Sequence, residues 1–155
     1  MRKKPARLSA LLGGACLLAG CASGPQTQAL APAGFDRVTV GGELRQRIER
    51  NFDRLETDYY QPDQVYWTEE QSGGWPGDKE GRTILALVLD ARASGRTPLY
   101  LDELIRRLPR ELNAKGYLGS IHEGSADEQQ LSGHGWLLRG LCEYYAWKKD
   151  PQVLE

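Results

Sequence analysis

A run of aliphatic residues at positions 84–89 constrains the fold more strongly than any other feature of the chain. Five of these six residues are isoleucine, leucine or valine, so a helix there has almost no polar face. Gly95 supplies a C-terminal stop, and Pro98 prevents simple continuation of the helix. Such a helix needs neighbouring elements on most of its sides. No other segment of the chain has the alternating apolar pattern of a strand. The sequence therefore predicts an all-α fold with this helix buried.

Two other segments have the pattern of helices that bury one face. The first begins near Gly42, and its apolar residues recur at steps of three and four: Leu44, Ile48, Phe52, Leu55 and Tyr59. The second follows Pro98, and its apolar face consists of Leu101, Leu104, Ile105, Leu108 and Leu112. We expect Pro109 to bend or split this helix and Gly116 to end it.

The segment at residues 134–150 predicts a second helix that is apolar on most of its sides. Its large apolar residues are Trp136, Leu137, Leu138, Leu141, Tyr144, Tyr145 and Trp147. Asp150 and Pro151 then have the pattern of an N-cap and the first residue of a further helix. A chain rarely stops one turn into a helix, so we expect this sequence to be the N-terminal part of a longer protein.

Long irregular loops are predicted between these helices, at residues 60–78 and 117–133. The proline and glycine residues of the first loop exclude regular structure. Loops of this length inside a compact domain are more often functional than accidental. The loops are therefore where we look for a binding site.

The first twenty residues indicate export. They combine a basic start with a short apolar run, which is typical of a signal peptide and too short to span a bilayer. The run ends in Leu-Ala-Gly-Cys, and Cys21 is thus a candidate for lipid attachment, although a plain secretory signal would also export the chain. We expect a signal peptide at residues 1–20, a flexible tether at 21–41 and a folded domain at 42–155. The anchored protein would face the periplasm or lie at the outer membrane.

Charge and cysteine content narrow the possible partners. The chain has 20 Lys and Arg and 21 Asp and Glu, and the first twenty residues hold four of the basic ones and no acid. The mature chain would have 20 − 4 = 16 basic and 21 acidic residues, a net charge of −5, which argues against nucleic acid. Cys16 leaves with the signal and Cys21 is lipidated, so Cys142 remains alone, and we expect it to be a small buried apolar residue.

Three segments together resemble the bacterial β-L-arabinofuranosidases, glycoside hydrolase family 127 and its close relatives. They are WPGDKEGRTILALVLDARASG, LNAKGYLGS and GHGWLLRGLCEYYAWKKDPQVLE, and their order and spacing carry the resemblance over residues 42–155. It implies a six-hairpin (α/α)6 toroid, of which about two hairpins are present. In such toroids the inner helices are surrounded and apolar all round, whereas the outer helices need only one apolar face.

The resemblance also implies a sugar site where loops enter the inner helices. The family has a Gly-His pair at the start of an inner helix, whose histidine hydrogen-bonds the arabinofuranose, and Gly133 and His134 match it. Glu128 matches an acidic residue six positions before that histidine. The catalytic cysteine, the zinc-binding cysteines and the acid/base glutamate of the family lie further along the chain, so no catalytic residue, metal ligand or cofactor is expected within these residues.

The loop at residues 72–80 contributes two further candidates. Asp78 is either the N-cap of the following helix, with Glu80 in its first turn, or a ligand for sugar hydroxyls. Asp78 and Glu80 are too close in sequence to flank a glycosidic bond as an acid/base pair. Trp75 and Trp67 either pack over helix ends or stack on a sugar ring.

The two histidines differ in their expected roles. His134 is predicted to open a helix, where the dipole favours a neutral ring that both donates and accepts hydrogen bonds. His122 lies in a polar loop and is expected to be a surface residue. Neither histidine has metal-ligand spacing to a cysteine, so a zinc site within these residues is not expected.

These features predict an exported, lipid-anchored glycoside hydrolase that acts on carbohydrate. The chain itself would supply cleft loops and no catalysis. The alternative is a helical-repeat lipoprotein that binds proteins, but that class has a fixed repeat with short turns, and no repeat is visible here.

Overall fold

The computed structural model of the chain describes residues 31–66 and 74–154. The chain divides into two units, and the second, Ala33–Glu155, contains every element described below. The described residues contain helices and no strand, which confirms the predicted all-α class. In chain order the elements are η1 (Phe35–Arg37), α1 (Gly42–Leu55), η2 (Asp58–Tyr60), α2 (Pro62–Val65), α4 (Asp78–Ser94), α5 (Leu101–Glu111), α6 (Glu128–Lys148) and η3 (Pro151–Leu154).

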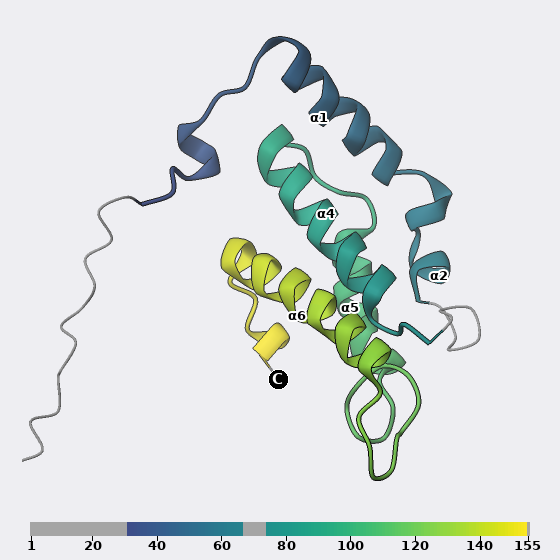
Figure 1. Cartoon of the computed structure of the whole chain (residues 1–155). Coiled ribbons are helices and arrows are strands. Elements are labelled where there is room, and N and C mark those ends of the chain that lie inside the picture. Colours follow the sequence, from purple (N-terminus) through teal and green to yellow (C-terminus); the bar gives the residue numbers. More distant parts are fainter. Residues whose placement is uncertain (1–30, 67–73, 155) are drawn as a thin grey trace, which may run out of the picture. The chain divides into compact units, whose positions relative to one another are not determined.

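Helix α4 is the centre of the fold, as the aliphatic run predicts. Its side chains at Ile84, Leu87 and Val88 are completely buried, and each contributes roughly 1.5–3 kcal/mol to folding by leaving water. The helix ends at Gly95, whose φ of 76° lies in the left-handed region that favours glycine. Helices α1 and α6 lie on different flanks of α4 (Figure 1).

Helix α1 runs antiparallel to α4. The guanidinium of Arg45 near its start donates to the carbonyl of Ser94 at 3.1 Å, and Asn51 donates to Asp90 one and a half turns later. Its apolar face is buried only in its last turn, at Phe52 and Leu55. The spacing of apolar residues in the sequence also predicts burial of Leu44 and Tyr59, but these side chains are 62% and 55% exposed.

The residues after α1 contain more regular structure than their proline content predicts. Pro62 is the first residue of the one-turn helix α2, where a backbone N–H would have no partner within the helix, so its absence loses no hydrogen bond. Val65 of the same turn is fully buried. The hydroxyl of the next residue, Tyr66, donates to the carbonyl of Leu104 in α5. Burial raises the pKa of this phenol well above its usual range, so it stays a neutral donor.

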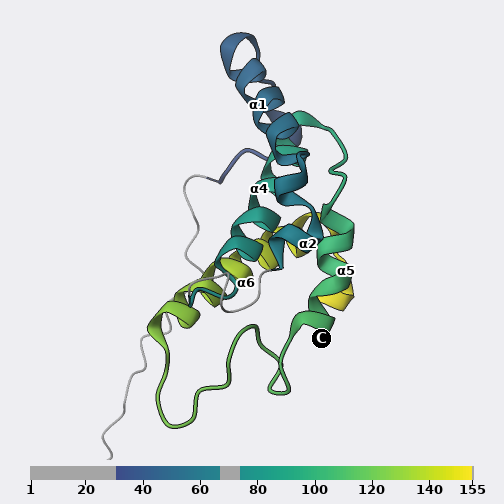
Figure 2. The same ribbon diagram turned by 90° about the vertical axis from the view of Figure 1, so that its right-hand side faces the viewer.

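Helix α5 buries the predicted face at Leu101, Leu104, Ile105 and Leu108. Pro109 lies inside its last turn without splitting the helix, because few residues follow it there. The helix ends at Glu111, before the predicted stop at Gly116. A long connection, drawn in green in Figure 2, then leads to α6.

Helix α6 runs parallel to α4, because three pairs of residues meet in the same order along both helices. Gly133 lies beside Gly77, Leu137 beside Gly81, and Gly140 beside Ile84. A Cβ on Gly81 would lie 2.5 Å from the Cα of Leu137, and a Cβ on Gly140 would lie 2.7 Å from the carbonyl oxygen of Gly81. The two backbones therefore touch at positions where only glycine leaves enough space.

The far side of α6 departs from the prediction of an almost fully buried helix. Its buried residues form one stripe, which faces α4 and includes Leu137 and Tyr144. On the opposite side Leu131 and Leu138 are 64% and 62% exposed. Cys142 is exposed as well, so the prediction that it is a buried apolar residue is wrong. The chain continues into the short helix η3, which begins at Pro151 as predicted.

Within residues 31–66 and 74–154, none of the helices is both long enough and apolar enough to cross a membrane. Cys21 and the other residues of the proposed signal and lipid-attachment segment lie outside the described residues.

We predict that Gly81→Ala destabilises the protein by about 3 kcal/mol, because the new methyl group would collide with the backbone of α6. Helix propensity alone predicts the opposite sign for this change. Gly135→Ala in α6 is the matched control, since a Cβ there meets nothing within 4 Å, and it should stabilise by up to about 1 kcal/mol. Urea unfolding followed by circular dichroism measures both. Equal stability of the two variants would contradict the close contact.

Candidate functional site

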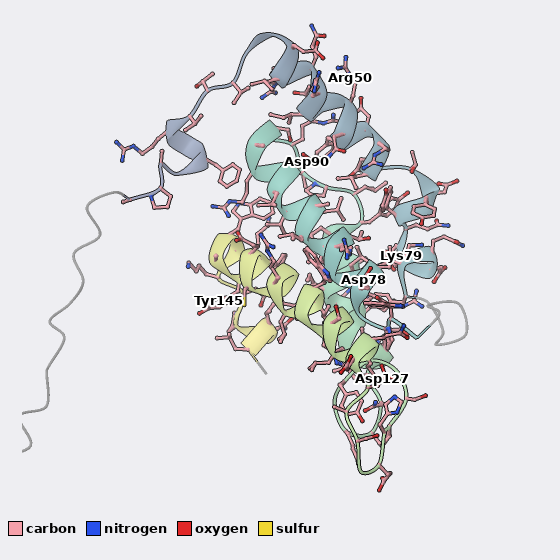
Figure 3. The ribbon with its side chains drawn as sticks, in the orientation of Figure 1. Arg50, Asp78, Lys79, Asp90, Asp127 and Tyr145 are labelled. Carbon is pink, nitrogen blue, oxygen red and sulfur yellow. The ribbon has the colours of Figure 1, made fainter. Side chains whose placement is uncertain are left out.

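Two loops that the sequence singles out meet at one end of the α4–α6 pair. A Cβ on Gly77 would lie 2.9 Å from the carbonyl carbon of Gly133 and 3.1 Å from the backbone nitrogen of His134. Gly74, next to Trp75, lies close to the side chain of Gln129. Asp78 and Asp127, labelled in Figure 3, stand at the starts of α4 and α6 at this end. The segment around Trp75 and the start of α6 are thus neighbours.

The cap of α4 differs from the prediction. Gly77, with φ of 93°, is the N-cap, and Asp78 is the first helical residue. Glu80 accepts a hydrogen bond from the Gly77 N–H at 2.9 Å, although it is 98% buried. Glycine takes the cap position because the chain reverses there in a left-handed conformation directly against Gly133. The prediction of Asp78 as the N-cap is therefore wrong.

The carboxylate of Asp78 binds Arg82 one turn along α4, at 2.9 Å. The guanidinium of Arg82 also lies over the ring of Trp136 in α6, 4.2 Å from its centroid. Asp78 lines a pocket between α1 and α4 that shares no residue with the pocket at His134. Asp78 and His134, which the sequence analysis assigns to one sugar site, therefore line different pockets.

His134 lies two turns inside α6 and does not open the helix, because α6 begins at Glu128. Its Nε2 lies 3.0 Å from the carbonyl oxygen of Leu118, and since a carbonyl only accepts, Nε2 carries the proton. In the neutral ring Nδ1 is then an acceptor. The ring of Tyr117 meets the imidazole edge to face, with centroids 5.7 Å apart.

Gln130 organises the loop above His134, and sequence reasoning missed it. Its side-chain amide is buried and donates to the carbonyls of Leu118 and Ser120, each at 3.0 Å. Its amide oxygen accepts from Nε2 of His122 at 3.0 Å. His122 is exposed as predicted, but this bond ties it to the start of α6.

A sequence signal for the start of α6 exists in the spacing of Asp127 and Gln130. The carboxylate of Asp127 is the N-cap and accepts from the Gln130 N–H at 2.7 Å. An acidic N-cap followed three residues later by glutamine is a recognised start of a helix. The signal was missed because the apolar pattern begins only after the Gly-His pair.

The loop and the first turns of α6 line an open pocket of about 260 Å³. Its walls carry two imidazoles, a phenol, a hydroxyl and a carboxylate, and no lysine or arginine: the lining residues are Tyr117, His122, Ser125, Ala126, Asp127, Gln130, Leu131 and His134. These groups, together with the side-chain amide of Gln130, donate and accept hydrogen bonds beside two apolar residues, Ala126 and Leu131. That chemistry suits a small, neutral ligand with several hydroxyl groups.

The other predicted site residues lie outside this pocket. Trp75 is 40% exposed beside the start of α6, and Glu128 is exposed at the first position of that helix. Neither lines the pocket of His134. Trp67 lies outside the described residues. Among the residues that the structure describes, no group of three His, Cys, Asp or Glu side chains could hold a metal ion.

Comparisons with protein-family models, with curated proteins and with solved structures find no match for this chain.

We predict that Gln130→Leu loosens the loop over His134. The change removes the donors to one buried and one partly buried carbonyl and also the partner of His122, which should lower the free energy of unfolding by about 2 kcal/mol. Amide hydrogen exchange should accelerate at residues 117–126 and stay unchanged in α4. Gln129→Leu, at an exposed neighbouring position, is the control. Unchanged exchange in the loop of Gln130→Leu would show that the amide does not hold it.

Proposed function

We propose that this chain is the N-terminal part of an exported, lipid-anchored glycoside hydrolase of the β-L-arabinofuranosidase type, in which it forms part of the carbohydrate-binding cleft. The observation that carries the proposal is the meeting of two loops at the starts of two parallel helices, with His134 in a pocket at that end. This is where an (α/α) toroid holds its sugar according to the resemblance described above.

The directions of the helices support a toroid. Helices α4 and α6 are parallel neighbours, as successive inner helices would be, and α1 is antiparallel to α4, as an outer helix would be. An inner helix needs an inner neighbour on each side. Helix α6 has α4 on one side and the exposed residues Leu131 and Leu138 on the other, where another inner helix would pack.

The chemistry of the His134 pocket supports a neutral sugar as ligand. A furanose presents hydroxyls that both donate and accept, and the pocket offers an imidazole acceptor, the Tyr117 phenol and the Ser125 hydroxyl. The ring contact with Tyr117 and the bond to the Leu118 carbonyl already hold the His134 ring in place, so binding would freeze few additional torsions. No residue of this chain is assigned to catalysis or to zinc, and the proposal requires neither here.

The alternative of a protein-binding helical-repeat lipoprotein has less support. Such a protein stacks units of nearly constant length. The four longer described helices have 14, 17, 11 and 21 residues, with connections of equally different lengths. A glycosidase toroid tolerates this irregularity, because its long loops form the cleft.

We predict that the chain binds methyl β-L-arabinofuranoside through His134. In NMR titrations the sugar should shift amide signals at residues 117–134, and His134→Ala should weaken binding about tenfold by removing one partly buried hydrogen-bonding group. His134→Gln is the control for loop position, because its amide can still donate to the Leu118 carbonyl. Undiminished affinity in His134→Ala would remove this residue from the site.

We predict that Cys21 carries the lipid. When the full chain is expressed in bacteria with labelled palmitate, the label should appear on the wild type and be lost in Cys21→Ser. Cys16→Ser is the matched control and should retain the label, because Cys16 would leave with the signal peptide. A labelled Cys21→Ser protein would contradict lipid attachment at this cysteine.

A further inference from the structure

A pocket of about 440 Å³ lies between the start of α5, the last turns of α6 and the short helix η3. Figure 2 shows the C-terminal end of the chain, in yellow, beside α5. Tyr144 in the pocket wall follows His134 by ten residues of α6, which is about 15 Å along the helix axis. The pocket shares no residue with the His134 pocket, and no role proposed above uses it.

Tyr144 presents a hydroxyl without a partner to this pocket. The residue is only 5% exposed. Among the residues that the structure describes, none forms a hydrogen bond with this hydroxyl, yet no fully buried side-chain oxygen there lacks a partner. The hydroxyl therefore reaches solvent, and it does so in the pocket that Tyr144 lines. A hydroxyl in this position gains a hydrogen bond when a polar ligand enters.

The hydroxyl of Tyr144 stays protonated at neutral pH. Burial raises the pKa of this phenol, and the negative charges of Asp102 and Asp150 raise it further. A neutral phenol donates one hydrogen bond and also accepts. The two carboxylates act on it from different segments, since Asp102 lies in the first turn of α5 and Asp150 directly precedes η3. Hydrogen-bonding groups from three elements therefore converge on one pocket.

The charged side chains of the wall balance one another. Asp102 and Asp150 contribute two negative charges, and Arg106 and Lys148 contribute two positive ones, so the sum is 2 − 2 = 0. A wall without net charge has no overall preference for an anion or a cation. It still offers acceptors at the carboxylates and donors at the guanidinium, the ammonium and the side-chain amide of Gln152. Mixed groups of this kind match hydroxyls, which both donate and accept.

We propose that this pocket binds a neutral sugar in the pyranose form. The sugar hydroxyls donate to the carboxylates of Asp102 and Asp150, and one of them pairs with the Tyr144 hydroxyl. Asp150 is already held in place, because it accepts from the backbone N–H of Gln152 at 3.0 Å. Ile105, which is 8% exposed, supplies the apolar contact for the C–H groups of the ring. The site does not depend on the arabinofuranosidase assignment.

The lining argues against charged and apolar ligands. Arg106 already approaches Glu103 at 3.9 Å, and the ammonium of Lys148 lies over the ring of Trp147, 4.0 Å from the centroid. An anion would therefore find no unmatched cation, and the carboxylates of the wall would repel it. A cation would be repelled by the two basic groups in the same way. An apolar ligand would bury the Tyr144 hydroxyl without a partner, which costs free energy.

The test is an NMR titration of the full chain, at constant ionic strength, with the methyl α-glycosides of glucose, galactose and mannose. At least one glycoside should shift amide signals at residues 101–106 and 144–153. Glucosamine and glucuronate add a positive or a negative charge to the same kind of ring, and they should bind no more tightly than the neutral glycoside. Tyr144→Phe should weaken binding about fivefold, because one neutral hydrogen bond to the ligand is lost.

Tyr144→Phe should fold like the wild type, because the hydroxyl has no partner within the part of the chain that the structure describes. Tyr145→Phe, at the next residue of α6 and outside the pocket, is the matched control and should bind like the wild type. Unchanged affinity in Tyr144→Phe, about tenfold tighter binding of a charged analogue, or no shifts at these residues with all three glycosides would each overturn the proposal. Methyl β-L-arabinofuranoside is titrated in parallel, and shifts confined to residues 117–134 would leave the His134 site standing and remove only this one.

Discussion

The contact between the backbones of α4 and α6 is the constraint on which the rest of the structure depends. Helices usually pack 8–10 Å apart because their side chains separate them. Here Gly81 and Gly140 let the chains touch, and Gly77 and Gly133 extend the contact beyond the start of α4. Because a glycine pair fits only its own partner, the contact fixes the register as well as the distance. A shift by one residue would bring a Cβ into the opposite backbone.

This register decides which loops meet. Since α4 and α6 are parallel, both of their preceding loops must come to the same end of the pair, although more than fifty residues separate Gly77 from Gly133. Helix α5 and the connection after it return the chain to that end. Gln130 then secures the connection to α6 by bonding two of its carbonyls. The glycine contact fixes the register of the two helices, and this register places the loops that form the His134 pocket.

The sequence predicts the helices better than it predicts what lies at their ends. The aliphatic run at residues 84–89 locates α4, because a helix with almost no polar face cannot lie at the surface and must be buried. Asp78 was predicted as its cap because aspartate is a strong capping residue, but the space beside Gly133 admits only glycine, which is a tertiary constraint. Leu138 and Cys142 are apolar by pattern and exposed in the structure, since periodicity reports a preference for burial and not the presence of a neighbour. Gln130 was missed for a related reason: its bonds go to a loop whose path no local pattern gives.

The His134 pocket and the pocket between α1 and α4 differ in charge although they flank one helix pair. The first has no basic side chain other than imidazoles, whereas the second has three cations and one carboxylate. Arg82 connects the second pocket to the interface, because it binds Asp78 in the wall and lies over Trp136 of α6. Moving α6 away from α4 would therefore release Arg82 from the ring of Trp136 and disturb the pocket between α1 and α4. Both pockets thus depend on the glycine contact that holds α4 against α6.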